Sequence, residues 1–330
     1  MLFMEVMQMD FLTDRIRPMY FKYLAAAFGS ALISSIYGVV DMAMVGQYQG
    51  PDGTAALAVV SPVWNIIYSL GLLMGIGGSV MGSVFSLIVM CSHFFTKWNT
   101  LQFVKPTQLL GKLKSISVTV FSTFFIDVAM GILTVLFNRQ ILKYLGTDAL
   151  SVYGIIINLS TFVQCCAYSI GQASQPILSV NFGTGKGDRI KELLQYAVGT
   201  AFVFGIIWTG ASLAFPNIFI RIFMTPTDTI LKIAPSIIRS YGISFLLLPF
   251  NIFSTYYFQA IMKPTTSFVV SVARGAVISG ILIMVLPVIA PANAIWFAMP
   301  VTELIVAVYA AIMMLHDTRQ ITAKDNILHE

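Results

Sequence analysis

The chain has 330 residues, of which 57% are hydrophobic and 10% are charged, and it carries a net charge of +5. A soluble domain carries about 25% charged residues, so the charges present here cannot cover the surface of a water-soluble body of this size. Most of the apolar side chains must therefore face lipid. The composition excludes a soluble enzyme and a soluble binding domain.

Apolar runs long enough to cross a bilayer recur along the chain. A transmembrane helix needs about 20 predominantly apolar residues, and about eight runs reach that length. In chain order the runs are 20–45, 55–95, 116–142, 150–179, 193–215, 234–262, 265–290 and 294–315. We therefore predict an all-α integral membrane protein with about eight transmembrane helices.

Short polar segments separate these runs. Two of the longer ones are residues 47–54 and 216–232, and their Pro, Gly and Asp residues are expected to interrupt the helices. Within the runs, Pro249 and Pro287 are expected to kink their helices, because proline lacks a backbone N–H.

The basic residues predict how the chain is oriented. If the N-terminus lies inside and the spans alternate, the inner segments collect most of the Lys and Arg residues. The outer segments then hold Arg139, Lys143, Arg221 and Lys232. Because cytoplasmic loops are enriched in Lys and Arg, we expect a multi-pass protein of the cell (plasma) membrane with both termini in the cytoplasm. The positive charge is thus a topology signal and gives no reason to expect a nucleic-acid partner.

Several short motifs occur in a specific order. Asp41 stands shortly before a Val-Gly pair, and Asp127 ends a Phe-Ile-Asp triplet. Residues 171–176 read Gly-Gln-Ala-Ser-Gln-Pro, residues 257–260 read Tyr-Phe-Gln-Ala, and residues 299–303 read Met-Pro-Val-Thr-Glu. Together these motifs resemble the MATE (multidrug and toxic compound extrusion) family of cation-coupled exporters.

The resemblance implies a domain plan that departs from the family pattern of two lobes of six helices. Residues 105–316 fit the whole second lobe, whereas the run 55–95 is about twice as long as one span requires. The resemblance therefore implies that this run is the second helix fused to the sixth, and that the third to fifth helices are missing. The expected parts are a cytoplasmic tail at 1–17, a reduced two-helix first lobe at 18–95, a basic cytoplasmic linker at 96–115, a complete six-helix second lobe at 116–316 and a cytoplasmic tail at 317–330.

Ionisable residues within spans are the first candidates for a functional site, since a charge at the membrane centre costs about 2.5–3.5 kcal/mol on insertion scales. The resemblance implies that Asp41 and Asp127 bind the coupling cation. The alternatives are an interfacial cap for Asp41 and a polar anchor between helices for Asp127. Arg274 is expected to pair with Glu303, which would give both a structural role, and Arg239 is expected to extend toward the outer surface.

Polar amides are numerous for apolar spans. They are expected either to bond across helices or to line a substrate path, and with Arg274 and Glu303 they form the predicted set of cavity or helix-interface residues. They are Asn138, Asn158, Gln164, Gln172, Gln175, Asn251 and Gln259.

Three functional hypotheses follow. The first is a secondary active multidrug exporter that exchanges H⁺ or Na⁺ for organic-cation xenobiotics in the lipid bilayer. The second is a truncated, non-transporting MATE-derived membrane protein, which could pair as a homodimer to cover its exposed lobe. The third is a flippase for a lipid-linked sugar. The sequence contains no nucleophile–base pair, nucleotide-binding motif or metal-ligand cluster, so we expect no enzyme activity, no cofactor and no metal site.

Overall fold

The computed structural model describes residues 10–32, 36, 40, 42–60 and 130–329. The chain divides into two units, residues 1–59 with 135–330, and residues 60–134. Only residues 60 and 130–134 of the second unit are described, and the helices discussed below belong to the first. Asp41, Asp127, the expected linker at 96–115 and most of the expected fused helix lie outside the described residues.

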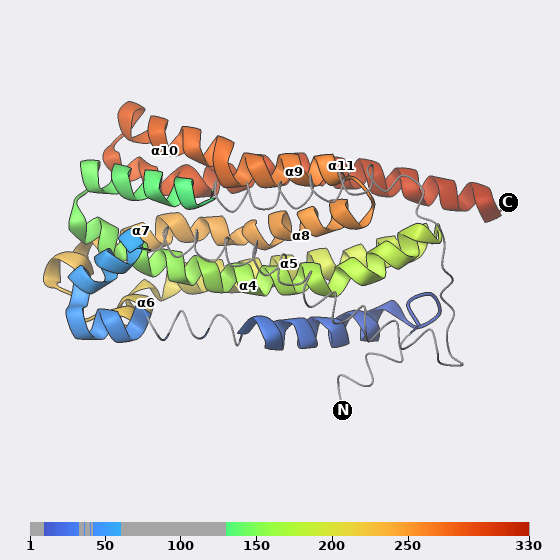
Figure 1. Cartoon of the computed structure of the whole chain (residues 1–330), viewed down its shortest axis with the longest axis horizontal. Helices are drawn as coiled ribbons and strands as arrows, with labels where there is room; N and C mark the ends of the chain where they lie inside the picture. Colours follow the sequence, from blue (N-terminus) through green and yellow to red (C-terminus); the bar gives the residue numbers. More distant parts are fainter. Residues whose placement is uncertain (1–9, 33–35, 37–39, 41, 61–129, 330) are drawn as a thin grey trace, which may run out of the picture. The chain divides into compact units, whose positions relative to one another are not determined.

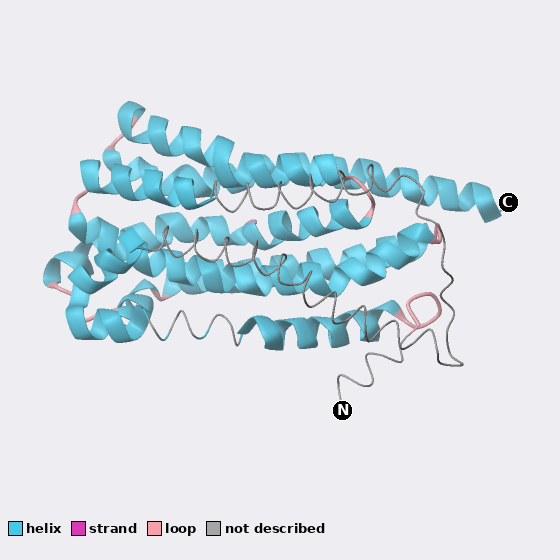
Figure 2. Cartoon of the chain, in the orientation of Figure 1, coloured by secondary structure: helices cyan, strands magenta, loops and turns pink. Residues whose placement is uncertain are grey.

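Helices account for all the regular secondary structure in the described ranges, which contain no strand (Figure 2). Residues 16–32, 42–60 and 130–144 are helical. The remaining elements are α4 (Thr147–Gly183), α5 (Gly187–Ala214), α6 (Pro216–Phe223), α7 (Asp228–Gly242), the 3₁₀ turn η1 (Ile243–Leu246), α8 (Leu248–Ala260), α9 (Pro264–Val272), the π-helical turn η2 (Ala273–Val277), α10 (Ile278–Ile289), the 3₁₀ turn η3 (Ala292–Phe297) and α11 (Ala298–His329). The predicted all-α fold is confirmed.

Five continuous helical stretches in the described part of the chain are long and apolar enough to cross a membrane. They are Thr147–Gly183, Gly187–Ala214, Asp228–Ala260, Pro264–Ile289 and Ala292–Thr322. They coincide with the last five predicted runs and extend a few residues beyond most of their ends. The prediction succeeded here because a long apolar segment in lipid must satisfy its backbone hydrogen bonds within itself, as a helix does.

Two predicted links contain helices. The expected link at 47–54 lies within the helical residues 42–60, where Gly50 has a φ of +60° directly before Pro51. That left-handed conformation is one that glycine adopts readily, and it allows the chain to change direction there. The expected link at 216–232 contains the short helix α6 and the start of α7, and α6 begins with Pro216, a favoured first residue of a helix.

The predicted kinks have different forms. Pro249 is in the first turn of α8, directly after the 3₁₀ turn η1, so the helical stretch Asp228–Ala260 is interrupted there as expected. Pro287 lies inside α10, near its end. The π-helical turn η2 between α9 and α10 was not predicted, and it contains Arg274.

The long helices of the first unit lie side by side. Figure 1 shows α4, α5, α8 and α11 running alongside one another, with residues 10–15 and the C-terminal end of α11 at the same end. One hydrophobic core joins these four helices to the helix that begins at residue 16, through buried residues such as Tyr20, Ile177, Ala197, Phe253 and Ala310. Small residues permit close contacts: Gly205 of α5 lies directly against the backbone of Leu246 in η1.

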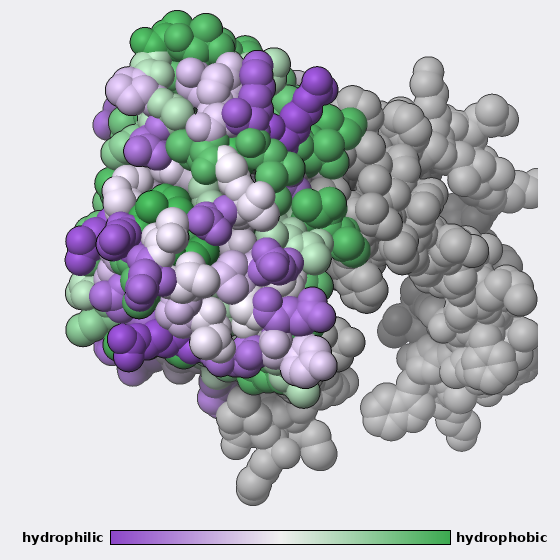
Figure 3. Space-filling model, turned by 90° about the vertical axis from the view of Figure 1, so that its left-hand side faces the viewer, coloured by the Kyte–Doolittle hydropathy of each residue, from purple (hydrophilic) through white to green (hydrophobic). Residues whose placement is uncertain are grey.

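The surface of this unit differs between its end and its flanks. Hydrophilic residues spread over the end that carries α6 and the start of α7 (Figure 3). The flanks expose large apolar side chains, including Ile206 and Ile207 on α5, Ile281 and Val288 on α10, and Ile312 on α11. Apolar flanks with a polar end are expected of helices that are surrounded by lipid.

Candidate functional site

A buried carboxylate lies at the meeting point of three spans. Glu303 is in the second turn of α11, and its side chain is 0% exposed. The Nε atom of Arg274, from η2, donates a hydrogen bond of 2.7 Å to Glu303 Oε1. The predicted pairing of these two residues is therefore confirmed.

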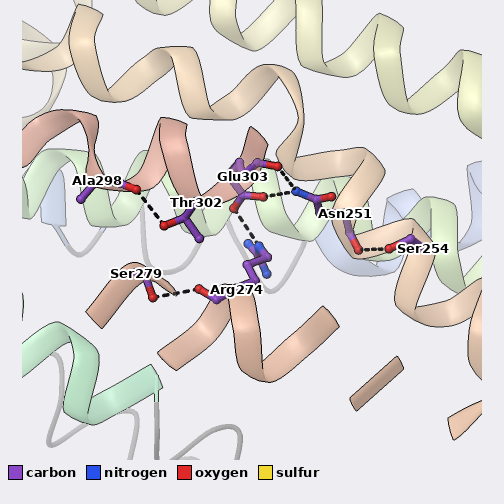
Figure 4. Close-up of polar contacts among 7 residues, drawn as sticks. All are labelled: Asn251, Ser254, Arg274, Ser279, Ala298, Thr302 and Glu303. Carbon is purple, nitrogen blue, oxygen red and sulfur yellow. Dashed lines mark hydrogen bonds and ion pairs between the residues drawn. The ribbon is translucent and has the colours of Figure 1, made fainter. Parts of the chain in front are cut away.

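Asn251 of α8 completes this cluster. Its Nδ2 atom donates to Glu303 Oε2 at 2.6 Å and to the backbone carbonyl of Glu303 at 2.8 Å. Figure 4 shows Asn251 and Arg274 approaching the carboxylate from different helices, so that each oxygen has a donor of its own. Asn251 was predicted only as one of several polar amides, because nothing in its local sequence pattern identifies its partner on α11.

Hydroxyl groups hold the backbone around the three residues. Ser279 Oγ donates to the carbonyl of Arg274 at 2.9 Å, and Ser254 Oγ donates to the carbonyl of Asn251 at 2.7 Å. Thr302 Oγ1 donates to the carbonyl of Ala298 at 2.8 Å (Figure 4). The bond from Ser279 gives the Arg274 carbonyl a partner inside a π-helical turn, a feature that often occurs at functional sites.

The charges of the cluster depend on each other. In a low-dielectric interior, removing one partner of a buried ion pair leaves the other unpaired, at a cost of about 3–5 kcal/mol. The Arg274 side chain is 13% exposed whereas that of Glu303 is fully buried, so the guanidinium is the more accessible member. Within the described part of the chain, Asn251 Oδ1 is buried without a hydrogen-bond partner and remains available as an acceptor.

The arrangement can respond chemically to a cation. A proton or a metal cation that neutralised the Glu303 carboxylate would weaken its bonds to Arg274 and to the side chain of Asn251, while the bond from Asn251 to the Glu303 backbone carbonyl would remain. The phenol groups of Tyr168 and Tyr241 lie within electrostatic reach of Arg274 and bring α4 and α7 to the same region. The hydrogen bonds of the cluster link the three elements η2, α8 and α11.

The other predicted residues lie apart from this cluster. Asn138 Nδ2 donates to the carbonyl of Ala58 at 2.7 Å and joins two helices, and Gln259 Nε2 donates to Ser267 Oγ at 3.3 Å. Asn158 Nδ2 donates within its own helix, to the carbonyl of Gly154 at 3.1 Å.

The remaining amides of the predicted set are Gln164, Gln172 and Gln175, all on α4, and Gln164 is partly exposed. Gln172 is exposed beside the phenol of Tyr256, and Gln175 is partly exposed. Arg239 donates from Nε to the carbonyl of Leu213 at 3.0 Å. The predicted set therefore separates into one cluster at Glu303 and individual helix contacts.

Part of the chain matches a known protein family. The MatE family model matches residues 123–286. The chain carries a MATE family domain. Asn251 and Arg274 lie within the matched residues of this MATE domain, whereas Glu303 lies beyond their end, on the last described helix.

Two curated relatives are similar to this chain in sequence. The multidrug export protein MepA of Staphylococcus haemolyticus is 22% identical over 303 residues, which is 88% of this chain and 62% of the relative. The probable multidrug resistance protein YoeA of Bacillus subtilis is 21% identical over 188 residues, 52% of this chain and 41% of the relative. This chain thus spans less than two thirds of the length of each relative.

Solved MATE structures share the fold. An outward-facing multidrug resistance MATE family transporter of the MOP superfamily aligns with a TM-score of 0.61 at 15% identity, over 73% of this chain and 55% of that one. The MATE multidrug transporter DinF-BH aligns with a TM-score of 0.58 at 18% identity, over 88% of this chain and 76% of that one. Together with the five apolar helices of membrane-spanning length in the described part, this likeness indicates a multi-pass helical membrane protein.

Proposed function

We propose that the chain is a secondary active multidrug exporter, which exchanges H⁺ or Na⁺ for organic-cation xenobiotics across the cell membrane. The observation that carries the proposal is that both curated relatives, MepA and YoeA, are named for multidrug export or resistance and match a chain with a MATE domain. The chain spans only part of each relative, so the activity of the whole relative is brought here as a proposal.

The proposed orientation places both termini in the cytoplasm. Residues 10–15 and the end of α11 lie at the same end of the first unit, which suits this arrangement. One positive charge that moves inward down the membrane potential supplies about 2.3 kcal/mol per 100 mV. Cation binding and substrate binding must then weaken each other equally, because the coupling between two sites is reciprocal.

In this proposal the coupling cation binds at Asp41 and Asp127, as the family resemblance implies. The Arg274–Glu303–Asn251 cluster holds the three spans of its lobe together. Of the predicted polar amides, Gln172 on α4 and Gln259 on α8 are exposed, and we take these two as the amides most accessible to a substrate.

The experiment is efflux of a fluorescent organic cation from proteoliposomes with an imposed proton or sodium gradient. We expect gradient-dependent transport by the native chain and its loss in Asp127→Asn. Asp228→Asn is the matched control, because Asp228 is an exposed carboxylate in the first turn of α7. Full transport by Asp127→Asn would remove that residue from the mechanism.

The same assay separates the two alternatives. A chain that is inserted and folded but transports no organic cation under either gradient would support a non-transporting, truncated MATE-derived protein. A lipid-linked sugar flippase needs free cationic side chains for a pyrophosphate. In the described part of the spans, Arg274 is engaged by Glu303 and Arg239 by the carbonyl of Leu213, which disfavours the flippase.

A further inference from the structure

A groove of about 900 Å³ runs along the first unit between α5 and α11. Over most of its length it is apolar, lined by side chains such as Leu194, Val198 and Phe202 on α5 and Leu304, Ala307 and Ala311 on α11. The η1–α8 segment contributes Leu247 and Phe250. An acyl chain matches the chemistry of this surface.

One end of the groove is cationic. Lys191 of α5 and Arg319 of α11 both line it, together with Thr322. The two helices meet at this end, where a Cβ on Gly187 would lie 2.9 Å from Thr322 Cα. Lys191 stands about one turn along α5 from that contact and Arg319 about one turn back along α11, so the two basic residues flank the same helix crossing.

These two cations are not engaged by any residue that the structure describes. Both are exposed, and within the described residues neither makes a hydrogen bond or an ion pair. The neighbouring cations Lys186 and Arg189 differ, because they donate to backbone carbonyls in the turn at residues 11–14. The described residues that line the groove include no acidic side chain.

We propose that this groove binds an anionic phospholipid, with its phosphate between Lys191 and Arg319 and an acyl chain along the apolar surface. The cationic end is the one that carries the end of α11, which is predicted to face the cytoplasm. Basic pockets between transmembrane helices on that side of a membrane bind anionic head groups. The inference rests on insertion of the chain in a membrane and on this predicted orientation, and it does not rest on the proposed transport activity.

Charge distinguishes this occupant from two others. An organic cation in the groove would be repelled by Lys191 and Arg319. A second copy of the chain could dock groove to groove about a two-fold axis. Lys191 and Arg319 of both copies would then face each other across one interface, and their like charges would repel. An anionic lipid is the occupant that supplies both the apolar and the charged complement.

The test is lipid retention, measured by native mass spectrometry after extraction from vesicles of equimolar phosphatidylglycerol and phosphatidylcholine. We expect the native chain to retain phosphatidylglycerol preferentially. The double substitution Lys191→Ala with Arg319→Ala should lower that preference by about thirtyfold, given the contribution of each basic residue to anionic-lipid binding. Lys143→Ala with Lys232→Ala removes the same charge from exposed residues at the opposite end and should leave the preference unchanged.

Three outcomes would overturn the assignment. They are a native chain without lipid preference, a double variant that retains phosphatidylglycerol as the native chain does, and a lipid-free dimer cross-linked through Val308. Lys191→Gln with Arg319→Gln repeats the test with side chains that remain polar. Val308 is exposed and lines the groove, so Val308→Trp should obstruct the groove and reduce the retention of both lipids.

Discussion

The cluster at Glu303 and the groove end at Lys191 and Arg319 show two different uses of charge in one membrane protein. At the cluster, the carboxylate is fully buried and both of its oxygens accept hydrogen bonds from neighbouring helices. At the groove, two cations are exposed and have no partner among the described residues. The first arrangement holds helices together, and the second leaves charge available for something outside the protein.

The largest expected effect is at the ion pair. Glu303→Leu leaves Arg274 and Asn251 with unpaired donors in the interior and should lower the free energy of unfolding by about 3–5 kcal/mol. Arg274→Met combined with Glu303→Leu should recover much of that loss, because no buried charge remains. Thermal unfolding in mild detergent, followed by tryptophan fluorescence, measures both variants.

The control for this prediction is Glu192→Leu, which removes an exposed carboxylate from α5. It should change stability by less than about 0.5 kcal/mol. Equal destabilisation by the control and by Glu303→Leu would show that the buried pair has no special role.

Asn251 should have an intermediate effect. Asn251→Ala removes the two donated hydrogen bonds but leaves the ion pair in place, so we expect a loss of about 1.5–3 kcal/mol, the range for hydrogen bonds to charged groups. Asn158→Ala is a matched control on α4, because that amide bonds only to its own helix. If the two alanine variants unfold at the same temperature, Asn251 does not join the helices as described.

The smallest effect on stability is expected at the groove. In vesicles of phosphatidylcholine alone, Lys191→Ala with Arg319→Ala should change the unfolding free energy by less than about 0.5 kcal/mol, since both residues are exposed and neither pairs with a described residue. With phosphatidylglycerol present, the native chain should gain stability that the double variant does not gain, because a ligand stabilises the state that binds it. A large loss of stability in phosphatidylcholine alone would show that these two cations hold the fold together, as the buried ion pair does.

Several features of the fold and the site were predictable from the sequence. The last five spans follow from apolar run length, and the interruption at Pro249 follows from the missing N–H of proline. The pairing of Arg274 with Glu303 was predictable because an unpaired charge deep in a span is costly. The assignments of Asp41 and Asp127 remain predictions.

Other features depended on contacts between distant parts of the chain. Asn251 joins the cluster because α8 and α11 bring residues far apart in sequence together, and no local pattern records that approach. The π-helical turn around Arg274 was likewise not visible, since its residues read as an ordinary apolar helix. Helical residues at 47–54 were missed because Gly50 and Pro51 indicate a break in the helix but do not show that both flanking segments are helical.

By itself, the sequence determined that α4 and α5 are membrane-spanning helices, because a long apolar segment in lipid must bond its own backbone. The two helices have the same mean hydropathy. Nevertheless, 67% of the residues in the apolar stretch of α4 are buried inside the protein, compared with only 22% of those in the apolar stretch of α5. Lipid tails are as apolar as a protein core, so hydropathy does not separate the two environments. Only the tertiary structure decided which helix became the core and which one borders the groove.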